Sequence, residues 1–211
     1  AEILFIQGSI VSAEHVQQGG EPLNLKEFVG SLDVPVIAGG VFDYSTATHL
    51  MRSGVAGVIV GSGSSSTVVN VPTATAIADV AAARRDYLDE TGGRYVHVLA
   101  DVPLWDADGI ALAIACGADA VMLGRSLEQA TEAAANGVYW EAQAAHPRFP
   151  RGGVSKDPIA STSTSLETVL FGPSSDPYGG LNIVGGLKRI MAKCGYTDVK
   201  AFQKADLAIR S

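Results

Sequence analysis

The sequence predicts an α/β fold built around a parallel β-sheet, and an internal repeat is the strongest sign of it. The stretches HLMRSGVAGVIVG (49–61) and AIACGADAVMLG (113–124) each read as a helix end, a glycine, a short apolar strand and a second glycine. Gly54 and Gly117 stand where a helix C-cap takes a left-handed backbone, which glycine adopts at the least cost. The strands are apolar throughout, as strands buried on both faces of a parallel sheet are.

The second glycine of each copy marks the carboxyl end of its strand. Gly61 follows the strand VIV, and Gly124 follows VML. Parallel α/β proteins bind their ligands at this edge of the sheet. The repeat therefore predicts a functional site near these two glycines.

Strands and helices alternate along the first two-thirds of the chain, as in a parallel sheet with right-handed crossovers. The expected strands are Ile3–Ile6, Val34–Ala38, Val58–Val60, Tyr95–Ala100 and Ala120–Leu123. The expected helices are Ser45–Ser53, Ala74–Glu90, Asp108–Cys116, Leu127–Ala135, Gly185–Cys194 and Asp198–Ala205.

We expect one α/β domain over residues 1–211, with C-terminal helices in 181–211. The segment Pro147–Pro177 differs from the rest because it is rich in proline, holds the run STSTS and has few apolar residues. Long loops without secondary structure are usually functional or disordered. We therefore predict a surface excursion there, either a mobile flap or an oligomer contact.

Composition excludes several classes of protein. The chain has 211 residues, 47% of them hydrophobic, with a formal net charge of −7, which argues against binding to nucleic acid or to anionic membranes. No apolar run approaches the roughly 20 residues of a membrane span. The chain opens on a strand-like AEILFIQG and not on the basic region of a signal peptide, so we expect no leader.

The two cysteines, Cys116 and Cys194, have no metal-ligand spacing. Each precedes a glycine at an expected helix end, so we predict that both are small buried residues and not reactive thiols. A cytoplasmic location follows from this pattern.

Glycine and serine gather at several strand ends, as GG (39–40), GSGSSST (61–67) and GRS (124–126). Successive backbone N–H groups in such segments form a nest that suits phosphate, although Gly/Ser runs also occur as flexible linkers. Arg125 and Ser126 are candidate phosphate ligands. A solvated surface position is the alternative for Arg125.

Asp101 ends the strand YVHVLAD at the same edge. A carboxylate there is able to accept hydrogen bonds from a ribose diol, or else to cap the turn that follows. We interpret His97 as a core histidine. His15, His49 and His146 have no acidic or cysteine residue at a spacing typical of a catalytic or metal site. The residues predict no metal site of His or Cys ligands and no Ser-His-Asp arrangement.

Several long strings together resemble the IMP dehydrogenase and GMP reductase family, and most closely its short bacterial branch without CBS domains. They are EPLNLKEFVGSLDVPVIAGGV, HLMRSGVAGVIVG, ATAIADVAAARRDYLDETGGRYVHVLAD, AIACGADAVMLG, ATEA and GLNIVGGLKRIMAKCGYTDVKAFQKAD. The resemblance implies a (βα)8 TIM barrel, of which this chain covers roughly the last five βα units. An open doubly wound sheet is the alternative fold, since five strands would satisfy it.

The resemblance also implies a reaction, the oxidation of IMP to XMP with NAD in guanine nucleotide (GMP) biosynthesis; a sister branch reduces GMP with NADPH. In the family a loop cysteine attacks the purine, hydride passes to the nicotinamide, and water releases the product. The implied substrate-binding residues are Ser64, Asp101, Gly124, Arg125 and Ser126, and Gln7 is implied at the cofactor. Carbonyls of Gly61 and Gly63 are implied ligands of a monovalent cation, K⁺.

The chain departs from the family pattern at four places. The nucleophile position falls near Thr67 or Val68, neither of which is cysteine, so we assign no catalytic residue. Val102-Pro103 replaces a phosphate-binding Gly-Gly, and proline has no N–H to donate. Trp140 begins a segment where a Gly-Met pair normally lines the base. Gln7 stands where many members carry an acid.

Two functions remain open at this point. One is an IMP dehydrogenase-type oxidoreductase that binds a purine nucleoside monophosphate. The other is a catalytically silent nucleotide-binding or assembly-forming relative or fragment. The resemblance further implies a homo-oligomer, a tetramer or an octamer.

Overall fold

The computed structural model describes residues 1–8, 23–61, 71–101, 106–134, 138–140, 154–156 and 164–208. The chain forms two compact units. The first comprises residues 1–102, 113–121 and 203–211, and the second comprises residues 103–112 and 122–202. The single domain expected over residues 1–211 stays a prediction.

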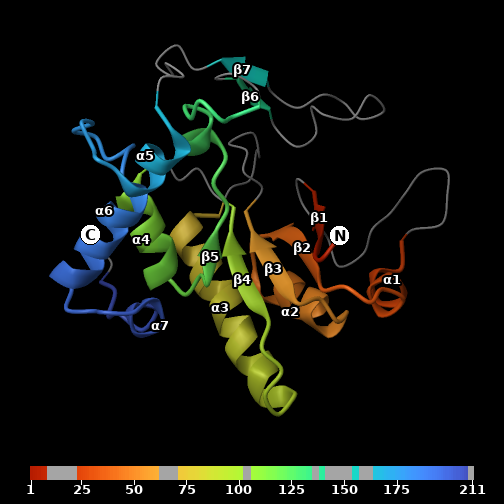
Figure 1. The fold of residues 1–211 in the computed structure, drawn as a ribbon. Helices are drawn as coiled ribbons and strands as arrows, with labels where there is room; N and C mark the ends of the chain where they lie inside the picture. Colours follow the sequence, from red (N-terminus) through yellow and green to blue (C-terminus); the bar gives the residue numbers. More distant parts are fainter. Residues whose placement is uncertain are drawn as a thin grey trace. The chain divides into compact units, whose positions relative to one another are not determined.

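The first unit contains a parallel sheet, in which the strands are hydrogen-bonded in the order of the sequence (Figure 1). All of the strands expected from the sequence are confirmed, with small shifts at their ends. They are β1 (Leu4–Gln7), β2 (Val36–Val41), β3 (Gly57–Val60), β4 (His97–Ala100) and β5 (Ala120–Val121).

Helices cover one face of this sheet. Helices α2 (Tyr44–Arg52) and α3 (Thr73–Glu90) pack on each other and on the strands β2, β3 and β4. Beneath them Ala38, Val58 and Val98 lie in register on adjacent strands, and all three are fully buried. This layer is the apolar core that the parallel-sheet interpretation requires.

The other face of the sheet is concave. Gln7 at the end of β1 donates a hydrogen bond to Asp101, which directly follows β4. Three strand spacings separate β1 from β4, about 14 Å across a flat sheet and more than the two side chains span. The sheet therefore curves as the wall of a barrel does, with α2 and α3 on the outside. Glycine at position 39 fits this crowded face, since a Cβ there would lie 2.5 Å from the Cβ of Ile59.

The two glycines that end the repeated helices have the predicted backbone. Gly54 has a φ of 97° and Gly117 a φ of 113°. A Cβ on Gly117 would also lie 2.6 Å from the Cβ of Ala81 on α3. Glycine is thus required at position 117 both by the left-handed turn and by the close approach of α3.

A polar network lies at the amino edge of the sheet. Asp119, just before β5, pairs with Arg84 of α3 at 2.6 Å and accepts a hydrogen bond from the Tyr95 hydroxyl at 2.6 Å. It also accepts from the backbone N–H of Val98 at 2.8 Å and from the Gln203 side chain at 3.0 Å. Burial would raise the pKa of Asp119, but these donors and the charge of Arg84 lower it overall.

The remaining elements are shorter. Helix α1 (Leu25–Gly30) lies in the first unit, and α4 (Ala107–Ala115) begins in the second unit and ends in the first. The second unit also holds the antiparallel pair β6 (Val138–Trp140) and β7 (Val154–Lys156). Its helical segments are the 3₁₀ turn η1 (Arg125–Leu127), α5 (Leu166–Phe171), α6 (Ile183–Lys193) and α7 (Val199–Phe202).

One expectation about secondary structure is wrong, and one segment contains a helix that was not expected. The helix expected over Leu127–Ala135 is absent from its described part, because Ala130 forms a parallel bridge with Thr164 and the Thr131 N–H donates to the Thr164 carbonyl at 2.9 Å. These main-chain bonds replace the helical ones. The segment Pro147–Pro177 contains α5, with Ser165 as its N-cap, and its role as a flap or an oligomer contact stays a prediction.

Two expectations about burial are also wrong. Cys194 is exposed at the C-cap of α6, whereas Cys116 is buried as expected, and burial raises the pKa of the Cys116 thiol. His97 is the first residue of β4 and is exposed, with its ring edge-to-face against Tyr95 at 5.1 Å. A position at the strand's amino end leaves this side chain outside the core.

Candidate functional site

The carboxyl edge of the sheet brings Gln7 and Asp101 together. The Gln7 side-chain nitrogen donates to a carboxylate oxygen of Asp101 at 2.5 Å. The backbone N–H of Asp101 donates to the Val60 carbonyl at 2.7 Å, which fixes the residue beside the end of β3. Two residues predicted for substrate and cofactor thus form one cluster.

Asp101 is buried, with 9% of its surface exposed. Burial raises the pKa of this carboxyl, and the hydrogen bond from Gln7 offsets only part of the rise. An ionised carboxylate has about four acceptor positions, and Gln7 fills one of them. The group is suited to accept further hydrogen bonds from a hydroxylated ligand at the edge of the sheet.

Gly61 lies at the same edge, directly after β3. Its backbone N–H donates to the Val41 carbonyl at 3.0 Å, and its φ is 94°. The other residues predicted for the loop that follows, Gly63, Ser64, Thr67 and Val68, lie outside the described residues. The K⁺ site at the carbonyls of Gly61 and Gly63 therefore stays a prediction.

The second predicted phosphate segment belongs to the second unit. Gly124 is exposed and precedes η1, while Ser126 is buried with 6% of its surface exposed. The Ser126 carbonyl accepts a hydrogen bond from the side chain of Gln129 at 2.9 Å, and the same nitrogen donates to the Gly180 carbonyl at 3.0 Å. Gln129 thus ties η1 to the loop before α6. The phosphate role of Gly124, Arg125 and Ser126 stays a prediction.

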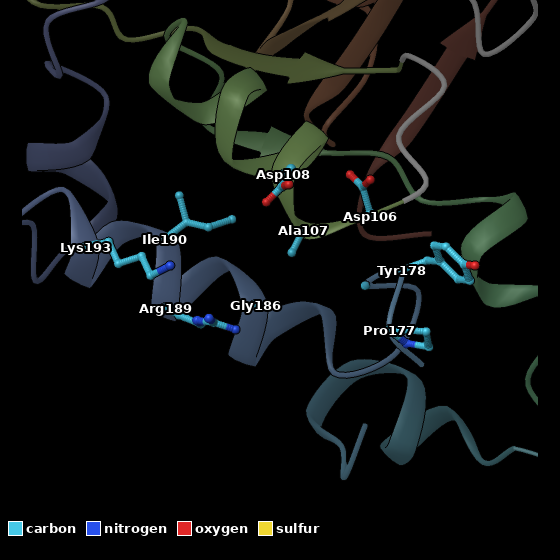
Figure 2. A pocket seen from close by; sticks show the side chains of 10 residues that line it. Asp106, Ala107, Asp108, Pro177, Tyr178, Gly186, Arg189, Ile190 and Lys193 are labelled. Atoms are coloured by element: carbon cyan, nitrogen blue, oxygen red, sulfur yellow. The ribbon is translucent and has the colours of Figure 1, made fainter. Parts of the chain in front are cut away.

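The second unit also holds a cavity of about 340 Å³ that sequence reasoning missed. Figure 2 shows acidic side chains on one side of it and basic ones on the other, with an aromatic ring at one end. These residues are Asp106 and Asp108 of the α4 start, Arg189 and Lys193 of α6, and Tyr178 of the loop before α6. The formal charges of these two acidic and two basic side chains sum to zero.

A sequence signal existed for part of this cavity. Asp106 accepts a hydrogen bond from the Gly109 N–H at 2.8 Å, as the first residue of the string DADG does at a helix start. Arg189 and Lys193 are four residues apart and so share one face of α6. Nothing in the sequence places these two helices against each other.

Two further features concern metal ions and membranes in the part of the chain that the structure describes. There, no group of three His, Cys, Asp or Glu side chains is arranged to hold a metal ion. The described helices include none with the length and apolar character needed to cross a membrane.

The curved parallel sheet, with helices outside and polar side chains meeting at its carboxyl edge, defines the class: the chain is part of a TIM-barrel protein. The IMP dehydrogenase / GMP reductase domain matches residues 10–167. The chain belongs to the IMP dehydrogenase / GMP reductase family. The predicted fold, the last part of a (βα)8 barrel, is confirmed, and the open doubly wound sheet is set aside.

Individual relatives agree with this assignment. An uncharacterized oxidoreductase of Mycolicibacterium smegmatis is 59% identical over 100% of this chain and 58% of its own length. The inosine-5′-monophosphate dehydrogenase of Aquifex aeolicus is 29% identical over 84% of this chain and 39% of its own.

A solved structure covers the whole chain. The crystal structure of an IMP dehydrogenase/GMP reductase-like protein from Corynebacterium glutamicum matches with a TM-score of 0.88 and 57% identity, over 100% of this chain and 56% of that one. The chain thus spans a little over half the length of such relatives.

Proposed function

We propose that the protein is an oxidoreductase that binds a purine nucleoside monophosphate at the carboxyl edge of the sheet and oxidises IMP to XMP with NAD. The observation that carries the proposal is the buried Asp101 carboxylate beside Gln7, at the edge where parallel α/β proteins bind ligands. Family membership and the oxidoreductase name of the Mycolicibacterium smegmatis relative support it.

In this proposal each described residue has a binding or orienting role. Asp101 accepts hydrogen bonds from the two ribose hydroxyls, because its carboxylate keeps acceptor positions that Gln7 does not fill. The carbonyls of Gly61 and Gly63 would hold K⁺. Ser64, Gly124, Arg125 and Ser126 contact the phosphate. NAD would supply the hydride acceptor, and Gln7 would be among the residues that hold it.

The second candidate is a silent relative that binds the nucleotide without turning it over. It is favoured by Thr67 and Val68, which stand near the position of the family's cysteine. Loss of a nucleophile from a covalent mechanism commonly lowers the rate by several orders of magnitude.

One experiment separates the two candidates. The native-length protein is mixed with IMP and NAD, NADH is followed by absorbance, and IMP binding is measured in parallel by calorimetry. Turnover supports the oxidoreductase, whereas binding without turnover, with activity gained in Val68→Cys, supports the silent relative. Absence of binding at millimolar IMP contradicts both, and GMP with NADPH tests the reductive sister reaction.

The proposal also includes the setting of the reaction. We place the protein in the cytoplasm, where thiols such as Cys116 and Cys194 stay reduced. We propose a homotetramer or octamer, which light scattering on the native-length protein tests directly.

A further inference from the structure

The contact between Gln7 and Asp101 joins two rigid parts of one sheet. The residues are 94 positions apart in the sequence, and their side chains meet at 2.5 Å. The backbone of Asp101 is held to Val60 at 2.7 Å, and Gly8, next to Gln7, donates to the Gly39 carbonyl at 2.7 Å. Because both backbones are fixed by the sheet, the amide holds the carboxylate in one orientation.

The chemistry of the pair leaves room for a ligand. A glutamine amide is a neutral donor, so it fixes the carboxylate without neutralising its charge or adding a like charge. An acidic side chain at position 7 would instead place a second negative charge against a buried carboxylate, which disfavours ionisation of one of them. A vicinal diol needs an ionised carboxylate with free acceptor positions.

From this geometry we infer that Gln7 is a positioning residue that presents Asp101 to a ribose diol and so sets the preference of the site for ribonucleotides over 2′-deoxyribonucleotides. The inference rests on the proposed function, because it requires a nucleotide at Asp101. It assigns Gln7 a role toward the sugar of the substrate, in addition to the cofactor role expected from the sequence.

A purely structural role for the pair predicts a different result. If Gln7 only ties β1 to β4, its loss weakens the binding of every ligand by the same factor. If Gln7 positions Asp101 for a diol, its loss weakens the ligand with two hydroxyls and leaves the 2′-deoxy ligand almost unchanged. The ratio of the two dissociation constants therefore distinguishes the roles.

The test uses calorimetry with IMP and 2′-deoxy-IMP on native-length protein, comparing the unmodified chain with Gln7→Glu. We expect the unmodified chain to prefer IMP by roughly tenfold, as hydrogen bonds to a charged group usually provide. In Gln7→Glu the preference is expected to fall to about one, while the affinity for 2′-deoxy-IMP changes less than about threefold.

The chain offers a matched control at the opposite edge of the sheet. Gln203 also donates its side-chain amide to a carboxylate, that of Asp119, at 3.0 Å. Gln203→Glu introduces the same charge beside a carboxylate but far from the predicted ligand edge. It is expected to lower stability and to keep the preference for IMP.

The possible outcomes distinguish a failure of the role inferred for Gln7 from a failure of the proposed function. An unmodified chain that binds neither nucleotide contradicts the proposed function, and the inference falls with it. A chain that prefers IMP, with a Gln7→Glu variant that keeps the preference or loses both ligands equally, overturns the inference alone. Should Gln7→Glu fail to fold, Gln7→Asn replaces it. The shorter amide does not reach Asp101, so we expect the same loss of the preference for IMP over 2′-deoxy-IMP.

Discussion

Arg84 and Asp119 form a partly buried ion pair, with 2.6 Å between the guanidinium nitrogen and the carboxylate oxygen. The pair belongs to a network in which Asp119 also accepts hydrogen bonds from three further donors, Tyr95, Val98 and Gln203. At the opposite edge of the same sheet, the side-chain donor to Asp101 among the described residues is Gln7. In TIM barrels the amino edge serves stability and the carboxyl edge serves binding and catalysis. Asp119 lies at the amino edge and Asp101 at the carboxyl edge.

The first prediction concerns the ion pair. Arg84→Met removes one partner and leaves the largely shielded Asp119 carboxylate without its counter-charge, which is expected to lower the free energy of unfolding by about 3 kcal/mol. Urea denaturation followed by circular dichroism measures this. Arg52→Met is the matched control, because Arg52 and Glu90 also pair at 2.7 Å but are half exposed. The urea midpoint of Arg52→Met is expected to stay close to that of the unmodified chain. An equal loss of unfolding free energy in both variants would contradict the role of burial.

The second prediction concerns stability at alkaline pH. Burial and the hydrogen bond to Asp119 raise the pKa of Tyr95 from 10.0 to about 12. A phenol whose pKa is higher in the folded state stabilises that state fully below pH 10, and this contribution is lost as the pH rises from 10 toward 12. Tyr95→Phe removes the titrating group. The variant is expected to lose less stability over this interval than the unmodified chain, measured as urea midpoints at each pH.

Parallel pH curves for the two chains would contradict this second prediction. Ultraviolet titration of the folded protein supplies an independent reading, since the ionisation assigned to Tyr95 should be absent from Tyr95→Phe.

The third prediction concerns the glycine that ends α4. Gly117→Ala puts a Cβ 2.6 Å from the Cβ of Ala81 and forces an alanine to a φ of 113°. Gly92→Ala is the control, since Gly92 also has a positive φ, of 67°, but a Cβ added there would meet no atom within 4 Å. The control is expected to lose about 1 kcal/mol from backbone strain alone, and Gly117→Ala about 2 kcal/mol more from overpacking. Equal losses in urea denaturation would show that α3 does not press on this turn.

The glycine pattern shows how much of the fold was predictable. Gly54 and Gly117 were expected at left-handed helix ends, and both are found there, because a helix C-cap is a local feature of sequence. Helix α5 was missed although local signals were present. Ser165 caps it, Glu167 stands in its first turn and Gly172 ends it. The proline-rich surroundings outweighed these signals.

The candidate site was less predictable than the fold. Asp101 was expected at the carboxyl edge because it follows a strand, and this is confirmed. Its contact with Gln7 was not expected, since it joins strands three positions apart and depends on how strongly the sheet curves. No periodicity in the sequence reports that curvature. The same holds for the cavity between α4 and α6, which depends on the packing of two helices.

The most direct test of the account compares the two aspartates, Asp101 and Asp119, in the native-length protein. Asp101→Asn and Asp119→Asn are each measured for IMP affinity by calorimetry and for stability by urea denaturation. We predict that Asp101→Asn weakens IMP binding at least about tenfold and leaves stability unchanged or higher, since burial disfavours its charge. Asp119→Asn is predicted to lower the free energy of unfolding by about 2 kcal/mol and to keep the affinity for IMP. The reverse pattern, with Asp101 needed for stability and Asp119 for binding, would contradict the account.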